Sequence, residues 1–69
     1  MTKQELIDEI NIALVNKPSY LRKGEFIYNY IDETYNIADD VRLKDFVSCF
    51  FDNDYIDKFL ECASKRIND

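Results

Sequence analysis

The stretch Cys49-Phe50-Phe51-Asp52-Asn53-Asp54, with Tyr55–Ile67 directly after it, decides the fold. An apolar run meets a cluster of residues that favour turns and helix starts, and a segment of helical periodicity follows. The apolar residues of that segment share one helical face: Ile56, Phe59, Leu60, Ala63 and Ile67. Charged residues take the opposite side: Asp57, Lys58, Glu61, Lys65 and Arg66. The pattern predicts a helix whose apolar stripe is covered by the rest of the chain.

A first helix is predicted at the start of the chain. Thr2 and Glu5 have the spacing of a capping box, in which each satisfies a backbone N–H near the helix start. The helix should end near Asn16, because Lys17 precedes Pro18 and is disfavoured in helical conformation. Its apolar stripe follows helical spacing: Leu6, Ile7, Ile10, Ala13 and Leu14.

A second helix is predicted to open after Pro18, with Ser19 as its N-cap and Asn36 ending it in a left-handed conformation. Its apolar stripe is expected to contain Tyr20, Gly24, Ile27, Ile31 and Tyr35. A glycine inside a helix costs stability, so its place on this stripe predicts that another backbone comes close there. Approach of a ligand to Gly24 is the alternative. We also expect four residues of the second and last helices to be buried together: Ile27, Ile31, Phe59 and Leu60.

Residues 37–53 allow two interpretations. The helical template is matched by Leu43, Phe46, Val47, Phe50 and Phe51, which favours a third helix from about Asp40 to Phe51. Extended structure is the alternative, because a second set of apolar residues nearly alternates: Val41, Leu43, Val47, Cys49 and Phe51. The cluster Asp52-Asn53-Asp54 then predicts a turn and the N-cap of the last helix.

The composition agrees with an all-α fold. The 69 residues suffice for one domain, and they contain one Gly and one Pro, too few for the turns of hairpins and sandwiches. We therefore predict a single helical domain over residues 1–69. It is expected to be a small compact bundle of three long helices plus a fourth helical segment that the pattern defines less clearly.

Charge and cysteine content limit the partners and the cellular compartment that we expect for this protein. The formal net charge of −5 argues against binding phosphate through bulk charge, so nucleic acid is not an expected partner. Two cysteines, Cys49 and Cys62, do not make the disulfide framework of a small secreted domain, and we expect both to be reduced and unbridged. No stretch has the character of a signal peptide or a membrane span. These features predict a cytoplasmic protein without a membrane partner.

The residues for catalysis are missing. The chain has no His, so histidine acid–base chemistry is absent and neither cysteine has a histidine to activate it. Asp52-x-Asp54 begins like a calcium loop, but the required Gly is absent and Ala63 stands where the bidentate Glu belongs. We therefore predict no enzyme activity, no metal and no cofactor.

Two pieces of the chain resemble very short, uncharacterised proteins of phages, prophages and other mobile elements. The first piece is Arg22-Lys23-Gly24-Glu25-Phe26-Ile27-Tyr28-Asn29-Tyr30, similar to an Arg-x-Gly-[Gln/Glu]-aromatic helix. The second is Val41-Arg42 and then Cys49–Ile56 with Phe59-Leu60, where this chain has Leu43-Lys44 in place of a Gly-Thr-like link. The resemblance covers about residues 20 to 62 and implies no activity.

By elimination, protein binding is the predicted function. Ten aromatic residues exceed the needs of so small a core, and aromatic side chains are enriched at interfaces. The predicted partner-binding surface is the polar face of the second helix with a tyrosine at its edge: Arg22, Glu25, Tyr28, Asn29 and Asp32. The alternative is that this row is an ordinary solvated face. We expect a small acidic regulatory factor with a protein partner, compatible with a homodimer; a nucleic-acid-associated helical regulator is the alternative function.

Overall fold

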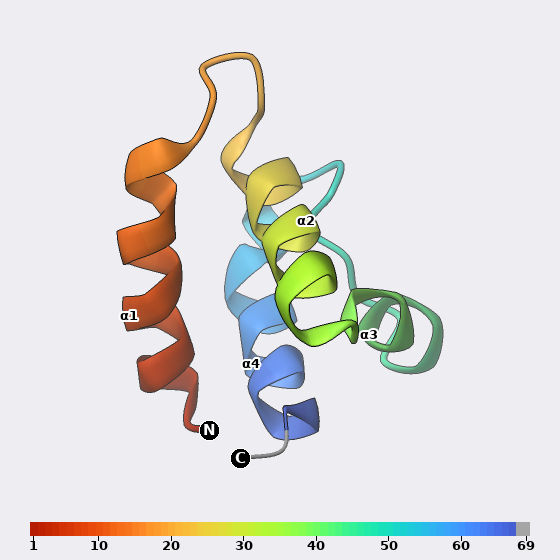
Figure 1. The fold of residues 1–69 in the computed structure, drawn as a ribbon. Helices are drawn as coiled ribbons and strands as arrows, with labels where there is room; N and C mark the ends of the chain where they lie inside the picture. Colours follow the sequence, from red (N-terminus) through yellow and green to blue (C-terminus); the bar gives the residue numbers. More distant parts are fainter. Residues whose placement is uncertain (68–69) are drawn as a thin grey trace.

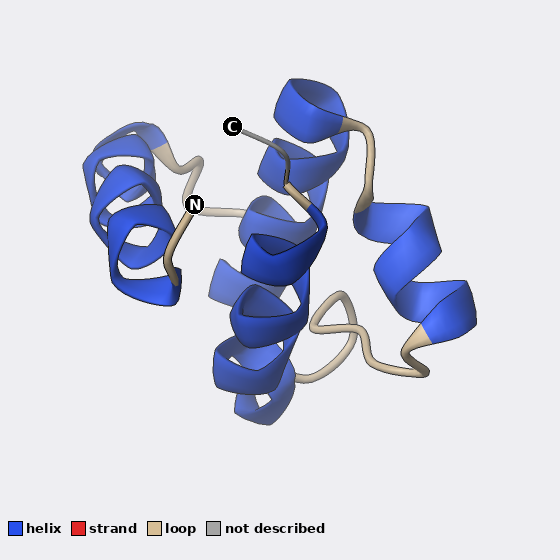
Figure 2. Cartoon of the chain, turned by 90° about the horizontal axis from the view of Figure 1, so that it is seen from below, coloured by secondary structure: helices blue, strands red, loops and turns tan. Residues whose placement is uncertain are grey.

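The computed structural model describes residues 1–67, which form helices and loops and contain no strand (Figures 1 and 2). The elements are α1 (Lys3–Ala13), η1 (Leu14–Asn16), α2 (Lys23–Tyr35), α3 (Ala38–Lys44), η2 (Asn53–Tyr55) and α4 (Ile56–Arg66). In both views α1 lies on one side of the pair α2 and α4, and the short helix α3 lies on the other. The predicted all-α class is confirmed, with three helices of 11 to 13 residues and a fourth of 7.

The first helix begins and ends as predicted. The Thr2 hydroxyl accepts from the Glu5 backbone N–H at 3.1 Å, and the Thr2 N–H donates to the Glu5 carboxylate at 2.9 Å. The last turn tightens into η1, which ends at Asn16 just before the extended residue Lys17. Local rules for capping and for proline are sufficient at both ends.

The second helix starts later than predicted. It begins at Lys23 with Arg22 as N-cap, so the predicted start at Ser19 is wrong. The preceding segment is instead a turn, in which the Lys17 ammonium donates to the carbonyls of Pro18 and Leu21 at 3.2 and 2.7 Å. This turn leaves Tyr20, predicted on the apolar stripe, 82% exposed. The other end of α2 is as predicted, because its C-cap Asn36 is left-handed, with φ 57°.

The third helix is shorter than predicted. It covers Ala38–Lys44, so the predicted helix from Asp40 to Phe51 is wrong beyond Lys44. Residues 45–52 form neither helix nor strand but an irregular loop, so the extended alternative is not found as a strand either. The loop brings Val47 and Cys49 into the core, at 6% and 0% exposure. A continuous helix cannot bury both positions in this way, because residues two apart point to different sides of a helix.

One core joins all four helices. Ile27, Ile31, Phe59 and Leu60 are buried together, as predicted. The remaining buried apolar residues come from α1, α2, α3, α4, the residue after α4 and the 45–52 loop: Leu6, Ile10, Tyr28, Ala38, Val41, Val47, Cys49, Ala63 and Ile67. Within residues 1–67 no helix combines the length and apolar character that crossing a bilayer requires.

Candidate functional site

Two of the residues predicted to bind a partner are used inside the fold. The Arg22 guanidinium pairs with Glu25 at 3.1 Å and donates to the Phe50 carbonyl at 3.2 Å. The Glu25 carboxylate accepts from the Arg22 backbone N–H at 3.3 Å and so caps α2. These contacts hold the 45–52 loop against the start of α2.

Tyr28 is buried, so its expected place at an exposed edge is wrong. Its side chain is 9% exposed, and its ring lies 5.5 Å from those of both Phe50 and Phe59. Its hydroxyl donates to Asp39 at 2.7 Å, and burial together with this carboxylate raises the pKa of Tyr28. The 45–52 loop and α3 cover the Tyr28 side chain. A third helix continued to Phe51 would not have followed this path over Tyr28.

The other two predicted residues, Asn29 and Asp32, are half-buried on α2. Asn29 lines an open hollow of about 370 Å³ between α2 and the preceding link. The five predicted residues therefore do not form one exposed recognition face. Arg22 and Glu25 hold the loop, Tyr28 belongs to the core, and Asn29 and Asp32 continue the face of α2 as half-buried residues.

The most exposed apolar side chains near the loop are ones that matched the template of the predicted third helix. Phe46 is 89% exposed, Phe51 80% and Leu43 61%. Phe46 also has a left-handed backbone, with φ 58°. We call these three exposed residues, Leu43 near the end of α3 and the two phenylalanines of the loop, the aromatic loop surface. Sequence periodicity missed this surface because the spacing of the three residues predicts a helix to Phe51, whereas the helix ends at Lys44.

The loop is fixed to α2 through Gly24. The Gly24 N–H donates to the Asn53 side chain at 2.9 Å, and the Cys49 thiol donates to the Gly24 carbonyl at 3.3 Å. A Cβ at position 24 would lie 2.0 Å from the Cys49 carbonyl oxygen. The predicted close approach of another backbone is confirmed, and the same carbonyl fills the space that the alternative gave to a ligand.

The two thiols differ in environment. Both cysteines are free, as predicted; Cys49 is fully buried and Cys62 is half-buried. Burial raises the pKa of Cys49 to about 12, so its reactive thiolate is scarce at neutral pH.

We expect native protein at pH 8 to release one equivalent of chromophore rapidly from a disulfide reagent such as DTNB. Cys62 should react, because it is half-exposed, and Cys49 should react only as the protein opens. The denatured monomer, handled without reductant, should show two thiols. Rapid reaction of both thiols in the native protein would contradict the burial of Cys49, and fewer than two in the denatured protein would indicate a disulfide.

Most basic side chains already have partners within residues 1–67. Six of the nine basic residues pair with carboxylates or backbone carbonyls at 4.0 Å or less: Lys3, Lys17, Arg22, Arg42, Lys44 and Arg66. The Arg66–Asp45 pair has two contacts, of 2.8 and 2.9 Å, and lowers the pKa of Asp45. The same part of the chain has no group of three His, Cys, Asp or Glu side chains arranged to hold a metal ion.

Comparison with protein-family models, with curated proteins and with solved structures finds no match to this chain. The resemblance to mobile-element proteins therefore stays a prediction.

Proposed function

We propose that this protein is a small regulatory factor that binds another protein through the aromatic loop surface. The observation that carries the proposal is Phe46, which is both conformationally strained and almost fully exposed. From the resemblance of Arg22–Tyr30 and Cys49–Ile56, we place the factor in a phage or other mobile element. There it would act on a protein of the host cytoplasm.

Phe46 contributes little to the stability of this chain. It follows α3 at the position where helices commonly end in a left-handed residue, usually glycine. For a residue with a side chain this conformation costs about 1–2 kcal/mol. Exposure of 89% means that little burial offsets the cost. A strained and exposed aromatic side chain of this kind supports contact with a second molecule.

Phe51 and the backbone of the loop are held in place before any partner arrives. The Phe51 ring packs edge-on against Phe50 with 4.9 Å between ring centroids, while most of its own surface stays exposed. The loop backbone is fastened by Arg22 at the Phe50 carbonyl and by the contacts of Gly24. Rigid aromatic anchors lose little entropy on binding, which favours affinity for a protein surface with an apolar groove.

The charge distribution supports a protein over a nucleic acid as the partner. Basic side chains that already pair with carboxylates have less to gain from phosphate, and the net charge repels a polyanion. Arg42 and Lys44, the cations nearest the loop in sequence, pair with Asp39 and Asp40.

Phe46→Gly separates stability from binding. Glycine adopts a positive φ without strain, so the variant should be more stable to urea by about 1 kcal/mol, while affinity for the partner falls. Loss of an aromatic anchor typically costs about 2 kcal/mol or more in binding, some thirtyfold in Kd. Wild type, Phe46→Gly and Phe51→Ser would be used as baits in host lysate, and affinities would then be measured with the purified partner.

Tyr20→Ser is the matched control, because Tyr20 is as exposed as Phe51 but lies in the link before α2. It should retain binding. Normal binding by both phenylalanine variants would refute the proposal. Loss of binding in Arg22→Ala alone would return the site to the polar face of α2.

A further inference from the structure

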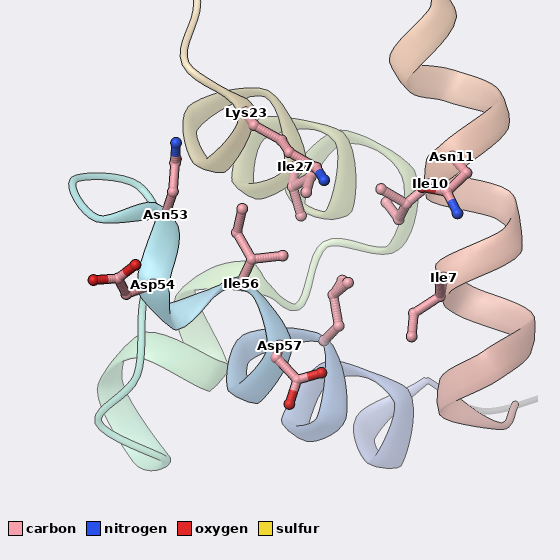
Figure 3. Close-up of a pocket in the computed structure, with 10 residues that line it drawn as sticks. Ile7, Ile10, Asn11, Lys23, Ile27, Asn53, Asp54, Ile56 and Asp57 are labelled. Carbon is pink, nitrogen blue, oxygen red and sulfur yellow. The ribbon is translucent and has the colours of Figure 1, made fainter.

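An open hollow of about 330 Å³ lies between α1, the first turns of α2, and the segment where η2 passes into α4 (Figure 3). Its apolar wall is wholly aliphatic: Ile7, Ile10, Ile27, Ile56 and Leu60. None of the three residues of the aromatic loop surface lines it.

The hollow is bordered by helices that are tied together around it. α1 joins α2 through Glu9, whose carboxylate accepts from the hydroxyls of Tyr30 at 2.6 Å and Tyr35 at 2.5 Å. α1 joins α4 through the 2.8 Å ion pair of Lys3 with Asp57. These contacts hold α1 in place, so the aliphatic wall is formed without a ligand, as is usual for binding pockets.

Lys23 is a charged residue that lines this hollow and has no ion-pair partner among residues 1–67. Figure 3 shows its ammonium extending past Ile27 toward α1, on the side where the Asn11 amide lies. Among residues 1–67 it has no ion pair within 4.0 Å.

The other polar groups at the hollow do not neutralise Lys23. Asp57 is already paired with Lys3 at 2.8 Å. The Asp54 carboxylate points away from the aliphatic wall in Figure 3. The side-chain oxygen of Asn53 accepts from the Gly24 N–H. An aliphatic wall with an unpaired cation and an amide at one edge complements a molecule that is apolar at one end and anionic at the other.

We infer that the hollow binds a small aliphatic carboxylate, with the hydrocarbon body against the partly exposed side chains of Ile7 and Ile56, above the buried Ile10, Ile27 and Leu60. The carboxylate would accept hydrogen bonds from the Lys23 ammonium and the Asn11 amide. This is a second site, separate from the proposed protein-binding surface. At about 30 Å³ per water molecule, the hollow holds the equivalent of about eleven waters, which suits a branched acid of about eight non-hydrogen atoms.

The eight isoleucines provide the test. Four of them line the hollow: Ile7, Ile10, Ile27 and Ile56. Four do not and serve as internal controls: Ile12, Ile31, Ile37 and Ile67. With ¹³C-labelled isoleucine methyl groups, titration by 4-methylpentanoate should shift the first set and leave the second unmoved. A ligand of this size is expected to bind in about the millimolar range.

Charge recognition is tested with matched ligands and variants. The corresponding alcohol should bind about fivefold more weakly than the acid, and the corresponding amine more weakly still. Lys23→Met keeps most of the aliphatic stem and should reduce affinity for the acid by about the same factor without changing affinity for the alcohol. Lys58→Met, an exposed lysine of α4 outside the hollow, should behave as wild type.

Several results would overturn the inference. These are equal binding of acid, alcohol and amine, shifts spread over all eight isoleucines, or no shift up to the solubility of the acid. Phe46→Gly should bind the acid normally, so failure of this site and failure of the protein-binding surface are distinguished.

Discussion

Replacement of Gly24 by alanine should destabilise the protein by about 3 kcal/mol or more, because a Cβ cannot fit where the loop crosses α2. The added atom would lie 2.0 Å from the Cys49 carbonyl oxygen and 2.8 Å from the Asn53 side-chain oxygen. Relief requires moving the loop backbone, which would break the contacts of Gly24 with Asn53 and Cys49. Alanine's higher helix propensity returns only about 1 kcal/mol, so the steric effect wins.

Urea unfolding followed by circular dichroism measures the effect. Lys23→Ala is the matched control, since it places alanine one residue earlier at an exposed position and should change stability by less than about 0.5 kcal/mol. If Gly24→Ala were as stable as wild type, or more stable as propensity alone predicts, the close approach of the loop would be refuted.

Phe59→Ala should lose about 3–5 kcal/mol, which in a domain of this size removes most or all of the folding free energy. Phe59 is 0% exposed and packs with Tyr28 in the core that joins the helices. The cavity left by the ring has few ways to collapse, because its neighbours come from different elements.

Thermal unfolding and urea titration of Phe59→Ala give the stability directly. Tyr55→Ala is the control, because Tyr55 is an aromatic of the same segment that is 51% exposed. It should cost less than about 1 kcal/mol. A melting temperature near that of wild type for Phe59→Ala would contradict the predicted core.

The parts of the fold that could be predicted are those decided by nearby residues. The capping box of Thr2 and Glu5 starts α1, the proline at 18 stops it, and Asn36 ends α2. The strong apolar stripe of α4 correctly predicted buried residues of this helix, including Phe59 and Leu60. In each case the relevant groups lie within about one helical turn of one another.

The parts that failed depend on distant contacts. The start of α2 is set by Arg22, Glu25 and Asn53 together. Asn53 accepts from the Gly24 N–H, and these two residues are 29 positions apart in the sequence. The end of α3 needs a left-handed residue, and Phe46 carries no local signal for that conformation. The helical spacing of the apolar residues therefore predicted a third helix to Phe51, although the chain leaves the helix after Lys44.

The predicted exposure of Tyr28 failed for the same reason. Tyr28 is buried by the 45–52 loop and by Asp39 of α3, so its burial could not be predicted without the path of that loop. Conversely, Phe46 and Phe51 matched the apolar pattern of a predicted third helix, but the loop leaves both side chains exposed. Whether these aromatic side chains are buried or exposed is decided by the tertiary structure.

The hydrogen bond from Gly24 to Asn53 has a consequence for synthesis on the ribosome. As the chain emerges, α1 and the later turns of α2 can form from residues already outside. Glu25 caps the first turn of α2 locally, but the Gly24 N–H waits for the side chain of Asn53, which is made 29 residues later. Core residues of α4 follow later still, so the core that joins the helices is incomplete until α4 has been made. Until then the core against which Phe50 packs is unfinished, and chaperones that bind exposed aromatic segments can reach this loop.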